Sequence, residues 1–212
     1  MLIVFLGAPG AGKGTQAKAL AEKKNLTHLA TGDMLRAEVA AGTELGLMAR
    51  AFMDRGDLVP DDVMIGMIKG RLKTPVSGGI LLDGFPRTVA QARALDEALE
   101  AAGTGVDRAI FFEVPTEELV RRLAGRATCS GCQRAYHDTF HPPRNADECD
   151  DCGAKLVRRE DDRPEAVRNR LDVYRTQTTP VLDHYRAAGK LVEIDGGQAI
   201  DAVQEELIAA VE

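Results

Sequence analysis

A glycine-rich loop is the first part of the sequence whose residue types and spacing could do chemistry. It runs from Gly7 to Thr15, follows the apolar run Leu2–Leu6 and precedes helical sequence. Glycines let the backbone turn tightly around phosphate oxygens, and the N-terminus of the next helix adds its positive end. Lys13 completes the pattern G-x-x-x-x-G-K and extends a positive charge toward the outer phosphates. The loop therefore predicts a site for the phosphates of a nucleoside triphosphate; the alternative is a strand-to-helix turn without a ligand.

The position after Lys13 departs from the general pattern. Gly14 stands where a serine or threonine usually places a hydroxyl on Mg²⁺, and Thr15 is the nearest hydroxyl. Asp83 ends a buried apolar run, where a carboxylate could hold Mg²⁺ directly or through water. The alternative for Asp83 is an ordinary turn aspartate before Gly84.

Arginines at the ends of predicted elements form a second chemical set. They are Arg36, Arg87, Arg126, Arg159 and Arg170. Phosphoryl transfer spreads negative charge over the oxygens of the transferred group, and fixed guanidinium groups stabilise that charge. Any one of these arginines could be a solvated surface side chain, but five of them beside a phosphate loop indicate transfer. No residue stands out as a general base, and none is needed if the acceptor is a phosphate that is already anionic.

All four cysteines fall into two pairs, Cys129-x2-Cys132 and Cys149-x2-Cys152, with 16 residues between the pairs. This spacing is typical of a zinc ribbon, and four free thiols are the alternative. Four thiolates fill a tetrahedral site and leave no position for water, so the zinc would be structural. His137 and His141 are surplus to such a site and are expected to be polar surface or hydrogen-bonding residues.

Five apolar runs predict the strands that must position these residues. They are Leu2–Leu6, His28–Leu29, Ile80–Leu82, Ala109–Val114 and Leu191–Ile194. Runs that are apolar throughout suit parallel strands covered on both faces, and helical sequence lies between them. The expected fold class is therefore α/β, with a parallel sheet flanked by helices and joined by right-handed crossovers.

Helices are predicted over Lys13–Lys24, Gln91–Ala102 and Thr116–Leu123, with Thr116 interpreted as a capping residue. A long helix beginning near Pro164 is predicted from an apolar stripe at helical spacing. That stripe consists of Val167, Leu171, Tyr174, Thr178, Leu182 and Tyr185.

Two segments interrupt the alternation of strands and helices. Thr31–Val59 is helical in character and contains no predicted strand. Arg126–Asp162 is polar, and its only residues among Ile, Leu, Val and Met are Leu156 and Val157. Because it cannot build an ordinary core, it needs another source of stability, which a zinc site supplies.

Composition limits the classes of function. The chain has 212 residues, is 44% hydrophobic and carries a formal net charge of -6, which argues against non-specific nucleic-acid binding. No apolar run reaches the roughly 20 residues that span a bilayer, and the opening run is too short for a signal peptide. The sequence thus predicts a cytoplasmic protein that binds neither membrane nor nucleic acid, in a reducing compartment where paired cysteines favour metal.

Together these motifs resemble the adenylate kinase family, in its long form with a zinc-bearing lid. The resemblance covers nearly the whole chain and rests on Gly7–Thr15, Thr31–Arg36, Asp83–Arg87 with Gln91, Arg126–Asp162 and Val167–Leu171. It implies the P-loop nucleoside-monophosphate-kinase fold with a five-stranded parallel sheet, and reversible transfer from ATP to AMP giving two ADP, with Mg²⁺. Gly14 is typical of the family, which implies that Mg²⁺ is held largely by phosphates, water and Asp83. A lid that closes would exclude water that could hydrolyse ATP.

The resemblance also assigns residues and domains. The ATP-binding set would be Gly10, Ala11, Gly12, Lys13, Gly14, Thr15, Arg126, Ala135, Tyr136 and Gln198. The AMP-binding set would be Thr31, Arg36, Asp57, Leu58, Val59, Gly84, Phe85, Pro86, Arg87, Gln91, Arg159 and Arg170. The catalytic set would be Lys13, Asp83, Arg87, Arg126, Arg159 and Arg170, with structural Zn²⁺ on the four cysteines. Residues 1–29, 60–125 and 163–212 would form the core, 30–59 the AMP-binding domain and 126–162 the lid of a monomer.

Two rival functions remain open from the sequence. One is a kinase for another nucleoside monophosphate, such as UMP or CMP, because spacing alone does not establish the base; Thr31 and Gln91 favour adenine only by resemblance. The other is a zinc-ribbon nucleic-acid module joined to a nucleotide switch. Against it, Arg126–Asp162 carries eight acidic side chains and six Arg or Lys side chains, a balance that would not attract a phosphate backbone.

Overall fold

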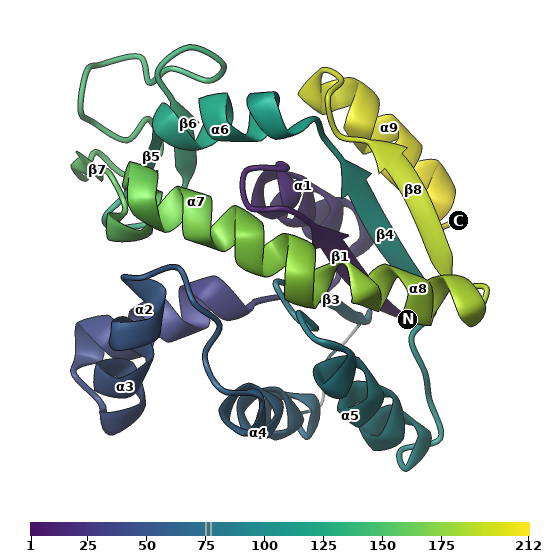
Figure 1. The fold of residues 1–212 in the computed structure, drawn as a ribbon. Helices are drawn as coiled ribbons and strands as arrows, with labels where there is room; N and C mark the ends of the chain where they lie inside the picture. Colours follow the sequence, from purple (N-terminus) through teal and green to yellow (C-terminus); the bar gives the residue numbers. More distant parts are fainter. Residues whose placement is uncertain (75, 77) are drawn as a thin grey trace.

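A five-stranded parallel sheet forms the centre of the molecule in the computed structural model, which describes residues 1–74, 76 and 78–212 (Figure 1). Its strand order is β2-β3-β1-β4-β8. The strands are β1 (Leu2–Gly7), β2 (Thr27–Ala30), β3 (Ile80–Asp83), β4 (Arg108–Glu113) and β8 (Leu191–Asp195). The predicted α/β class and parallel sheet are confirmed, and each predicted strand lies within one residue of an observed one at both ends.

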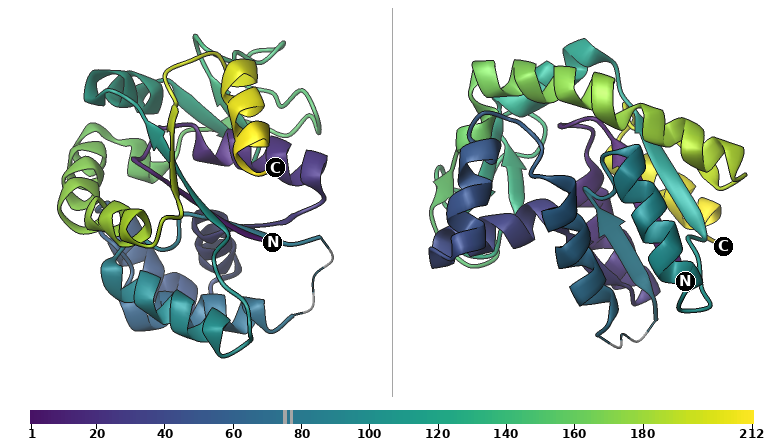
Figure 2. Two further views of the ribbon diagram at one scale, coloured as in Figure 1. Left: turned by 90° about the vertical axis from the view of Figure 1, so that its right-hand side faces the viewer. Right: turned by 60° about the horizontal axis from the view of Figure 1, so that its bottom comes forward.

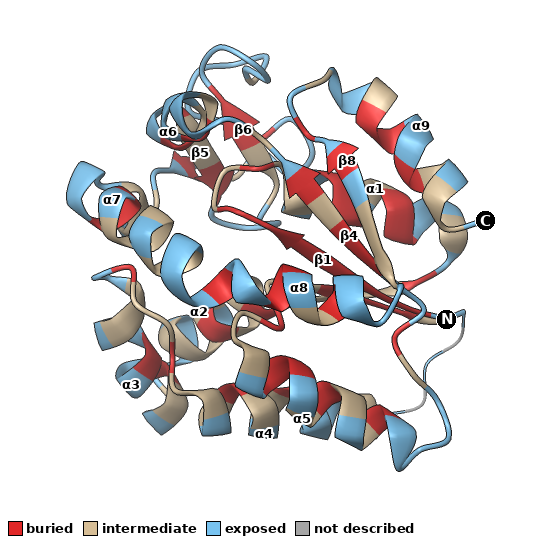
Figure 3. Ribbon diagram, turned by 45° about the vertical axis from the view of Figure 1, so that its right-hand side comes forward, coloured by how far each residue is buried: buried red, intermediate tan, exposed pale blue. Residues whose placement is uncertain are grey.

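Alternation along β1 explains why helices cover both faces of the sheet (Figure 2). Leu2, Val4 and Leu6 pack on one face with α4 (Asp61–Leu72), α5 (Val89–Glu100) and α8 (Pro180–Ala187). Ile3 and Phe5 pack on the other face with α1 (Lys13–Lys24) and α9 (Ile200–Ala210). Successive side chains of a strand point to opposite faces, so both faces must be covered when every residue is apolar. Burial is accordingly concentrated in the strands and on the inward sides of these helices (Figure 3).

Strand register brings the two main motifs to one edge of the sheet. Phe5 of β1 pairs with Asp83 of β3, so Gly7 and the phosphate loop leave the sheet close to where Asp83 ends its strand. Ala30 of β2 also pairs with Asp83, and Thr31 follows it directly. The carboxyl ends of parallel strands therefore gather the loop, Asp83 and Thr31.

Two helices that follow strands of the sheet differ in how their N-termini are capped. Helix α5 begins at Val89, two residues before the predicted start, because the Thr88 hydroxyl accepts the N–H of Gln91 and caps it. Helix α6 (Thr116–Ala124) begins as predicted, but Thr116 lies inside the helix and makes no cap; Pro115 precedes it. The capping role assigned to Thr116 is therefore wrong.

The long helix predicted from Pro164 onward is observed as two α-helices joined end to end by a π-helical turn. Helix α7 (Pro164–Val173) leads into a π-helical turn at Tyr174–Thr178 and then into α8. The N–H of Thr179 bonds to the carbonyl of Tyr174 at 2.9 Å. Pro180 has no N–H and its ring would clash with a carbonyl one α-helical turn earlier, which explains the wider turn before it.

The two predicted interruptions leave the sheet as separate protrusions (Figure 1). Residues 31–59 contain α2 (Thr31–Ala41) and α3 (Glu44–Met53) and no strand, as expected. Residues 126–162 contain a small antiparallel sheet of β5 (Arg126–Cys129), β6 (Ala135–His137) and β7 (Leu156–Val157), ordered β6-β5-β7. Among the described residues, this segment has one small cluster of buried hydrophobic residues, which consists of Cys129, Tyr136, Cys149 and Leu156. None of the helices that the structure describes is long and apolar enough to cross a membrane.

Candidate active site

A cleft of about 1190 Å³ opens at the carboxyl ends of β1, β2 and β3. The phosphate loop forms one wall, residues of the 31–59 segment form another, and residues of the 126–162 segment face them. Arg170 of α7 also lines it. Ligands of open α/β sheets bind at this edge, so the fold places the cleft where such chemistry is expected.

The phosphate loop has the backbone geometry that anion binding requires. Gly10 and Gly12 have φ values of 87° and 91°, a region that favours glycine. A Cβ on Gly10 would lie 3.0 Å from Leu123 and 3.1 Å from the carbonyl oxygen of Leu119 in α6, so the loop is also packed closely against that helix. The loop turns directly into α1 at Lys13 and aims the helix N-terminus at the cleft.

Lys13 reaches back over the loop that it follows. Its Nζ donates to the carbonyl oxygens of Gly7 at 2.7 Å and Ala8 at 2.9 Å. Burial lowers the pKa of Lys13 to about 8, and the positive charges of Arg87, Arg170 and Arg126 add to this while Asp83 opposes it. A cleft lined by this many positive charges attracts anions.

Asp83 faces the start of α1 from the end of β3. A Cβ added to Gly14 would lie 3.5 Å from its Oδ2. Burial alone would raise the pKa of Asp83, but the neighbouring His28 and the Lys13 charge outweigh burial and hold that pKa below its usual value. An ionised carboxylate oxygen beside a phosphate loop suits Mg²⁺, which is usually held by one or two carboxylates together with water and substrate phosphates.

His28 was not singled out from the sequence. Its Nε2 lies 3.4 Å from Oδ2 of Asp83, at ion-pair distance, and it lines the cleft from β2. Only the register of β2 against β3 reveals this relationship, because 55 positions separate the two residues in the chain.

The turn after Asp83 holds Arg87 in place. Nε of Arg87 donates to the carbonyl oxygen of Gly84 at 2.8 Å, and Gly84 has a φ of 80°. Thr31 donates its hydroxyl to the carbonyl oxygen of Asp83 at 3.2 Å. Burial lowers the pKa of Arg87, and the charge of Arg170 lowers it further. The guanidinium is thus half-buried, held in one orientation and close to the positive charge of Arg170.

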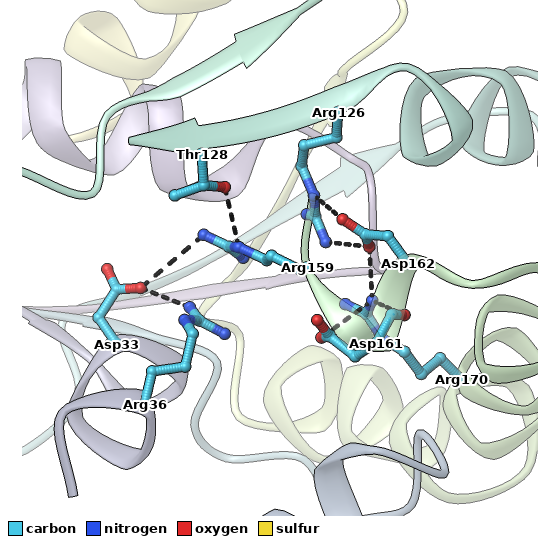
Figure 4. A network of polar contacts seen from close by, with 8 residues as sticks. All are labelled: Asp33, Arg36, Arg126, Thr128, Arg159, Asp161, Asp162 and Arg170. Atoms are coloured by element: carbon cyan, nitrogen blue, oxygen red, sulfur yellow. Dashed lines mark hydrogen bonds and ion pairs between the residues drawn. The ribbon is translucent and has the colours of Figure 1, made fainter. Parts of the chain in front are cut away.

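The remaining arginines form a network with carboxylates (Figure 4). Arg126 pairs with Asp162 through two nitrogens, and Arg170 Nη1 lies 3.1 Å from both Asp161 Oδ2 and Asp162 Oδ1. Because Asp161 and Asp162 end the 126–162 segment, they join the base of that segment to α7.

Arg159 connects the two protrusions on the other side of the cleft. Its Nε donates to Thr128 Oγ1 at 3.0 Å, and its Nη2 lies 4.0 Å from Asp33, which also pairs with Arg36 (Figure 4). Burial lowers the pKa of Arg159 to about 10, and the charges of Arg126 and Arg36 contribute. Five arginines, of which Arg87 is described above, therefore meet in one cleft from four different parts of the chain.

All but one of the residues predicted from the sequence as nucleotide-binding or catalytic line this cleft. The exception is Phe85, whose side chain is 1% exposed and packs in the core. Tyr136 lines the cleft, but its hydroxyl accepts the N–H of Asp150 at 2.8 Å and lies 3.4 Å from Cys149 Sγ. The Tyr136 hydroxyl therefore belongs to the internal structure of the protrusion.

The lining residues that the sequence analysis did not assign to the site include, besides His28, Arg122 and His137. Arg122 of α6 donates from Nη1 to the carbonyl oxygen of Gly196 at 2.9 Å, which joins it to the loop before Gln198. His137 is 9% exposed, and its Nδ1 accepts the N–H groups of Thr139 and Phe140 at 3.0 and 3.2 Å. The hydrogen-bonding role expected for His137 is confirmed, whereas a surface position is not.

The four cysteines meet in the 126–162 segment. One Sγ atom from each lies within 4.8 Å of the other three. The N–H groups of Gly131 and Cys132 point to the Cys129 Sγ at 3.3 and 3.4 Å, which favours a thiolate at that position. Four soft sulfur donors at this separation fit a tetrahedral ion such as zinc, whose Zn–S bonds are about 2.3 Å.

Comparison with known proteins agrees with this geometry. The sequence model of the family described as "Adenylate kinase" matches residues 5–190. The chain is 51% identical over 208 residues to the adenylate kinase of Methanothrix thermoacetophila, covering 98% of this chain and 96% of the relative. It is 50% identical over 212 residues to that of Methanocella arvoryzae, covering 100% and 98%. It is 49% identical over 213 residues to that of Archaeoglobus fulgidus, covering 100% and 98%.

The chain has a phosphate loop and an arginine-lined cleft, and its relatives are about 50% identical to it over nearly their whole length. The chain belongs to the adenylate kinase family.

Proposed function

We propose that this protein catalyses the reversible, Mg²⁺-dependent transfer of a phosphoryl group from ATP to AMP, giving two ADP. The observation that carries this proposal is the convergence of Lys13 with Arg87, Arg126, Arg159 and Arg170 on one cleft beside a phosphate loop. Binding one anionic ligand requires fewer fixed cations than these five. Phosphoryl transfer between two nucleotides places negative charge on the donor phosphates, the transferred group and the acceptor phosphate, and each needs cations nearby.

The donor nucleotide would bind on the side of the phosphate loop. Backbone N–H groups of Gly10 through Thr15 and the Lys13 ammonium would hold the ATP phosphates. Arg126, Ala135, Tyr136 and Gln198 would border the rest of ATP. Arg122 and His137, which line the same side, join them in this proposal.

The acceptor would bind between the 31–59 segment and the turn after β3. Thr31, Arg36, Asp57, Leu58, Val59, Gly84, Pro86, Arg87 and Gln91 line this side of the cleft. Phe85 would take part only through its backbone, because its side chain is buried in the core. Arg159 and Arg170 also line the cleft and would clamp the phosphoryl group in transit.

The chemistry asked of the protein is positioning and charge stabilisation. An oxygen of the AMP phosphate attacks the γ-phosphorus of ATP, the bond from that phosphorus to the bridging oxygen breaks, and ADP leaves. No proton needs to move, because the attacking phosphate is an anion at neutral pH. Mg²⁺, when bound near Asp83, supplies charge neutralisation on the phosphates. Lys13 and the arginines hold both chains in line and balance the charge on the equatorial oxygens.

We also propose that the two protrusions are the moving parts of the enzyme. Residues 30–59 would be the AMP-binding domain, 126–162 the lid, and 1–29, 60–125 and 163–212 the core. The contact of Asp33 with Arg159 joins the two protrusions across the cleft, which supports a closing role. Closure would exclude water from the transferring phosphoryl group.

The metal of the lid is proposed to be zinc in a structural role. Four cysteine ligands leave no open coordination position, and the lid's hydrophobic cluster is too small to hold it alone. Zinc binding contributes on the order of 10 kcal/mol or more to such small folds. The working unit is proposed to be a monomer on the family resemblance alone.

A coupled assay of ADP formation tests the function. ATP with AMP should give ADP at a rate that depends on Mg²⁺, and Arg87→Ala should lose orders of magnitude in turnover while keeping its circular dichroism spectrum. The rival within the class, a UMP or CMP kinase, is tested by replacing AMP with GMP, CMP and UMP. Equal or faster turnover with UMP or CMP would overturn the choice of AMP.

A further inference from the structure

Asp61 lies directly behind the proposed base-binding residue Gln91. It is the first residue of α4 and immediately follows the 31–59 segment and Pro60. Oδ1 of Asp61 accepts from Nε2 of Gln91 at 2.7 Å, and its Oδ2 accepts from the Thr88 hydroxyl at 2.9 Å. Both oxygens of one carboxylate are therefore engaged at the start of α5.

Gln91 is held at its other end by the backbone. Its Oε1 accepts the N–H of Arg87 at 2.8 Å, and the residue is 2% exposed. An ionised carboxylate can only accept a hydrogen bond, and a backbone N–H can only donate one. The amide nitrogen must face Asp61 and the amide oxygen must face Arg87, so the orientation of this amide follows from its partners.

This orientation fixes what Gln91 can offer to a ligand. One N–H of Nε2 and one lone pair of Oε1 remain after the two internal hydrogen bonds. Gln91 lines the cleft, so it presents one donor and one acceptor to a ligand, and their relative positions are fixed by the orientation of the amide. A 6-aminopurine has an acceptor at N1 beside a donor at N6, whereas a 6-oxopurine has a donor at N1 beside an acceptor at O6. An amide free to turn over could serve both edges, but a fixed amide serves one.

We infer that Asp61 is a positioning residue that sets the base specificity of the acceptor site, selecting a 6-aminopurine monophosphate over a 6-oxopurine one by fixing the amide of Gln91. This inference rests on the proposed function, which places the base of AMP at Gln91. Asp61 is not among the described residues that line the cleft, so it acts through Gln91.

The second oxygen of Asp61 strengthens the same control. Thr88 caps α5 by accepting the Gln91 N–H at 3.1 Å while donating its own hydroxyl to Asp61. The carboxylate therefore holds both the side chain of Gln91 and the start of the helix that carries it. A misoriented polar group in a binding site costs specificity by large factors, because buried donors and acceptors are then left unpaired.

Asp61→Asn tests the inference, with Asp62→Asn as the matched control. The asparagine side chain keeps the size and shape of the aspartate but can donate as well as accept, so it removes the carboxylate's constraint on the Gln91 amide and leaves only the N–H of Arg87 to oppose the turned-over amide. Asp62 is the next residue of the same helical turn, is exposed, and undergoes the same change of charge. The measured quantity is kcat/KM for AMP divided by kcat/KM for IMP, with ATP saturating as donor.

We expect Asp61→Asn to lower this ratio about tenfold or more, mainly through a higher KM for AMP, and Asp62→Asn to leave it unchanged. An unchanged ratio in folded Asp61→Asn would overturn the inference. A wild-type protein that forms no ADP from AMP would instead overturn the proposed function, so the two failures are distinguishable.

A double-mutant cycle separates positioning from a general structural effect. In a Gln91→Ala background, Asp61→Asn should have no further effect on the AMP-to-IMP ratio, because the residue through which it acts is gone. An equal additional loss in that background would mean that Asp61 acts by another route. Thermal melting of each variant shows whether it is folded, and AMP and IMP binding by calorimetry gives the same ratio if turnover is too slow to measure.

Discussion

Arg126 donates from its Nε to Oδ2 of Asp162 at 2.8 Å, and its second nitrogen bonds to Oδ1 of the same carboxylate. This two-point contact orients the plane of the guanidinium. The Asp162 side chain is only 5% exposed and also lies 3.1 Å from Arg170. One buried carboxylate therefore positions two of the arginines proposed to act on the transferring phosphoryl group.

Asp162→Ala is expected to lower kcat/KM for ADP formation roughly 10- to 100-fold, because misplacing reacting or stabilising groups by about an ångström has effects of that size. The change should also lower the melting temperature, since two partly buried guanidiniums lose a counter-charge. Steady-state kinetics and thermal melting measure both effects. Glu160→Ala is the control, because Glu160 is exposed and pairs with the exposed Arg163. Equal effects of the two substitutions would contradict the positioning role of Asp162.

The pKa of Lys13 predicts the pH dependence of ATP use. In the free protein this pKa is lowered to about 8 by burial, so the ammonium is lost as the pH rises through that value. Since kcat/KM reports ionisations of the free enzyme, kcat/KM for ATP should be flat well below pH 8 and fall toward tenfold per pH unit above it. Arginine stays charged throughout this range, so Lys13→Arg should lose that decline even if its absolute rate is lower. The same decline in Lys13→Arg would assign it to another group.

Gly84→Ala should damage the acceptor side of the cleft. A Cβ there would lie 2.7 Å from Thr31 Oγ1 and 3.0 Å from Arg87 Nη2, and the backbone has a φ of 80°. Gly103→Ala is the matched control, since its φ is 69° and no atom lies within 4 Å of an added Cβ. Backbone strain alone costs about 1–2 kcal/mol, so Gly103→Ala should lower the free energy of unfolding by that amount. Gly84→Ala should lower the free energy of unfolding by more than Gly103→Ala does and should raise KM for AMP several-fold. Chemical denaturation and steady-state kinetics measure the two effects. Equal effects of the two substitutions would contradict the prediction.

Removal of the zinc proposed for residues 126–162 should unfold that segment selectively. Protein purified without added metal should contain about one zinc per chain by elemental analysis, and a strong chelator should abolish activity and lower the melting temperature. Cys149→Ser should do the same, because Cys149 is one of the four clustered cysteines and is itself buried in the small hydrophobic cluster of residues 126–162. Adding zinc back should restore the chelated wild type but not the variant. A metal-free protein with the wild-type melting temperature would rule out the structural role.

Much of the site could be predicted from the sequence because its motifs are local. Lys13–Lys24 is a helix with the predicted bounds, since a glycine-rich loop must end where the helix begins. The cysteine pairs come together because each pair is held by its own tight turn. Thr116 was misassigned, because a threonine before a helical pattern can be either the cap or the first helical residue, and Pro115 took the cap position.

Relations between distant segments escaped the sequence for a different reason. His28 lies beside Asp83 only through the pairing of β2 with β3. Asp61 meets Gln91 only because α4 packs beside α5. Phe85 sits within a binding motif, yet its side chain turns into the core, and no pattern of residue types distinguishes that from a side chain facing the ligand.

The sequence by itself determined the α/β class, the glycine-rich loop, the pairing of the four cysteines and the family, because each of these depends on residue type and spacing over short ranges. Only the tertiary structure decided which carboxylate orients which arginine, which way the amide of Gln91 faces, and that five arginines from four parts of the chain line one cleft. Those outcomes depend on strand register and helix packing, which join residues that the chain keeps far apart.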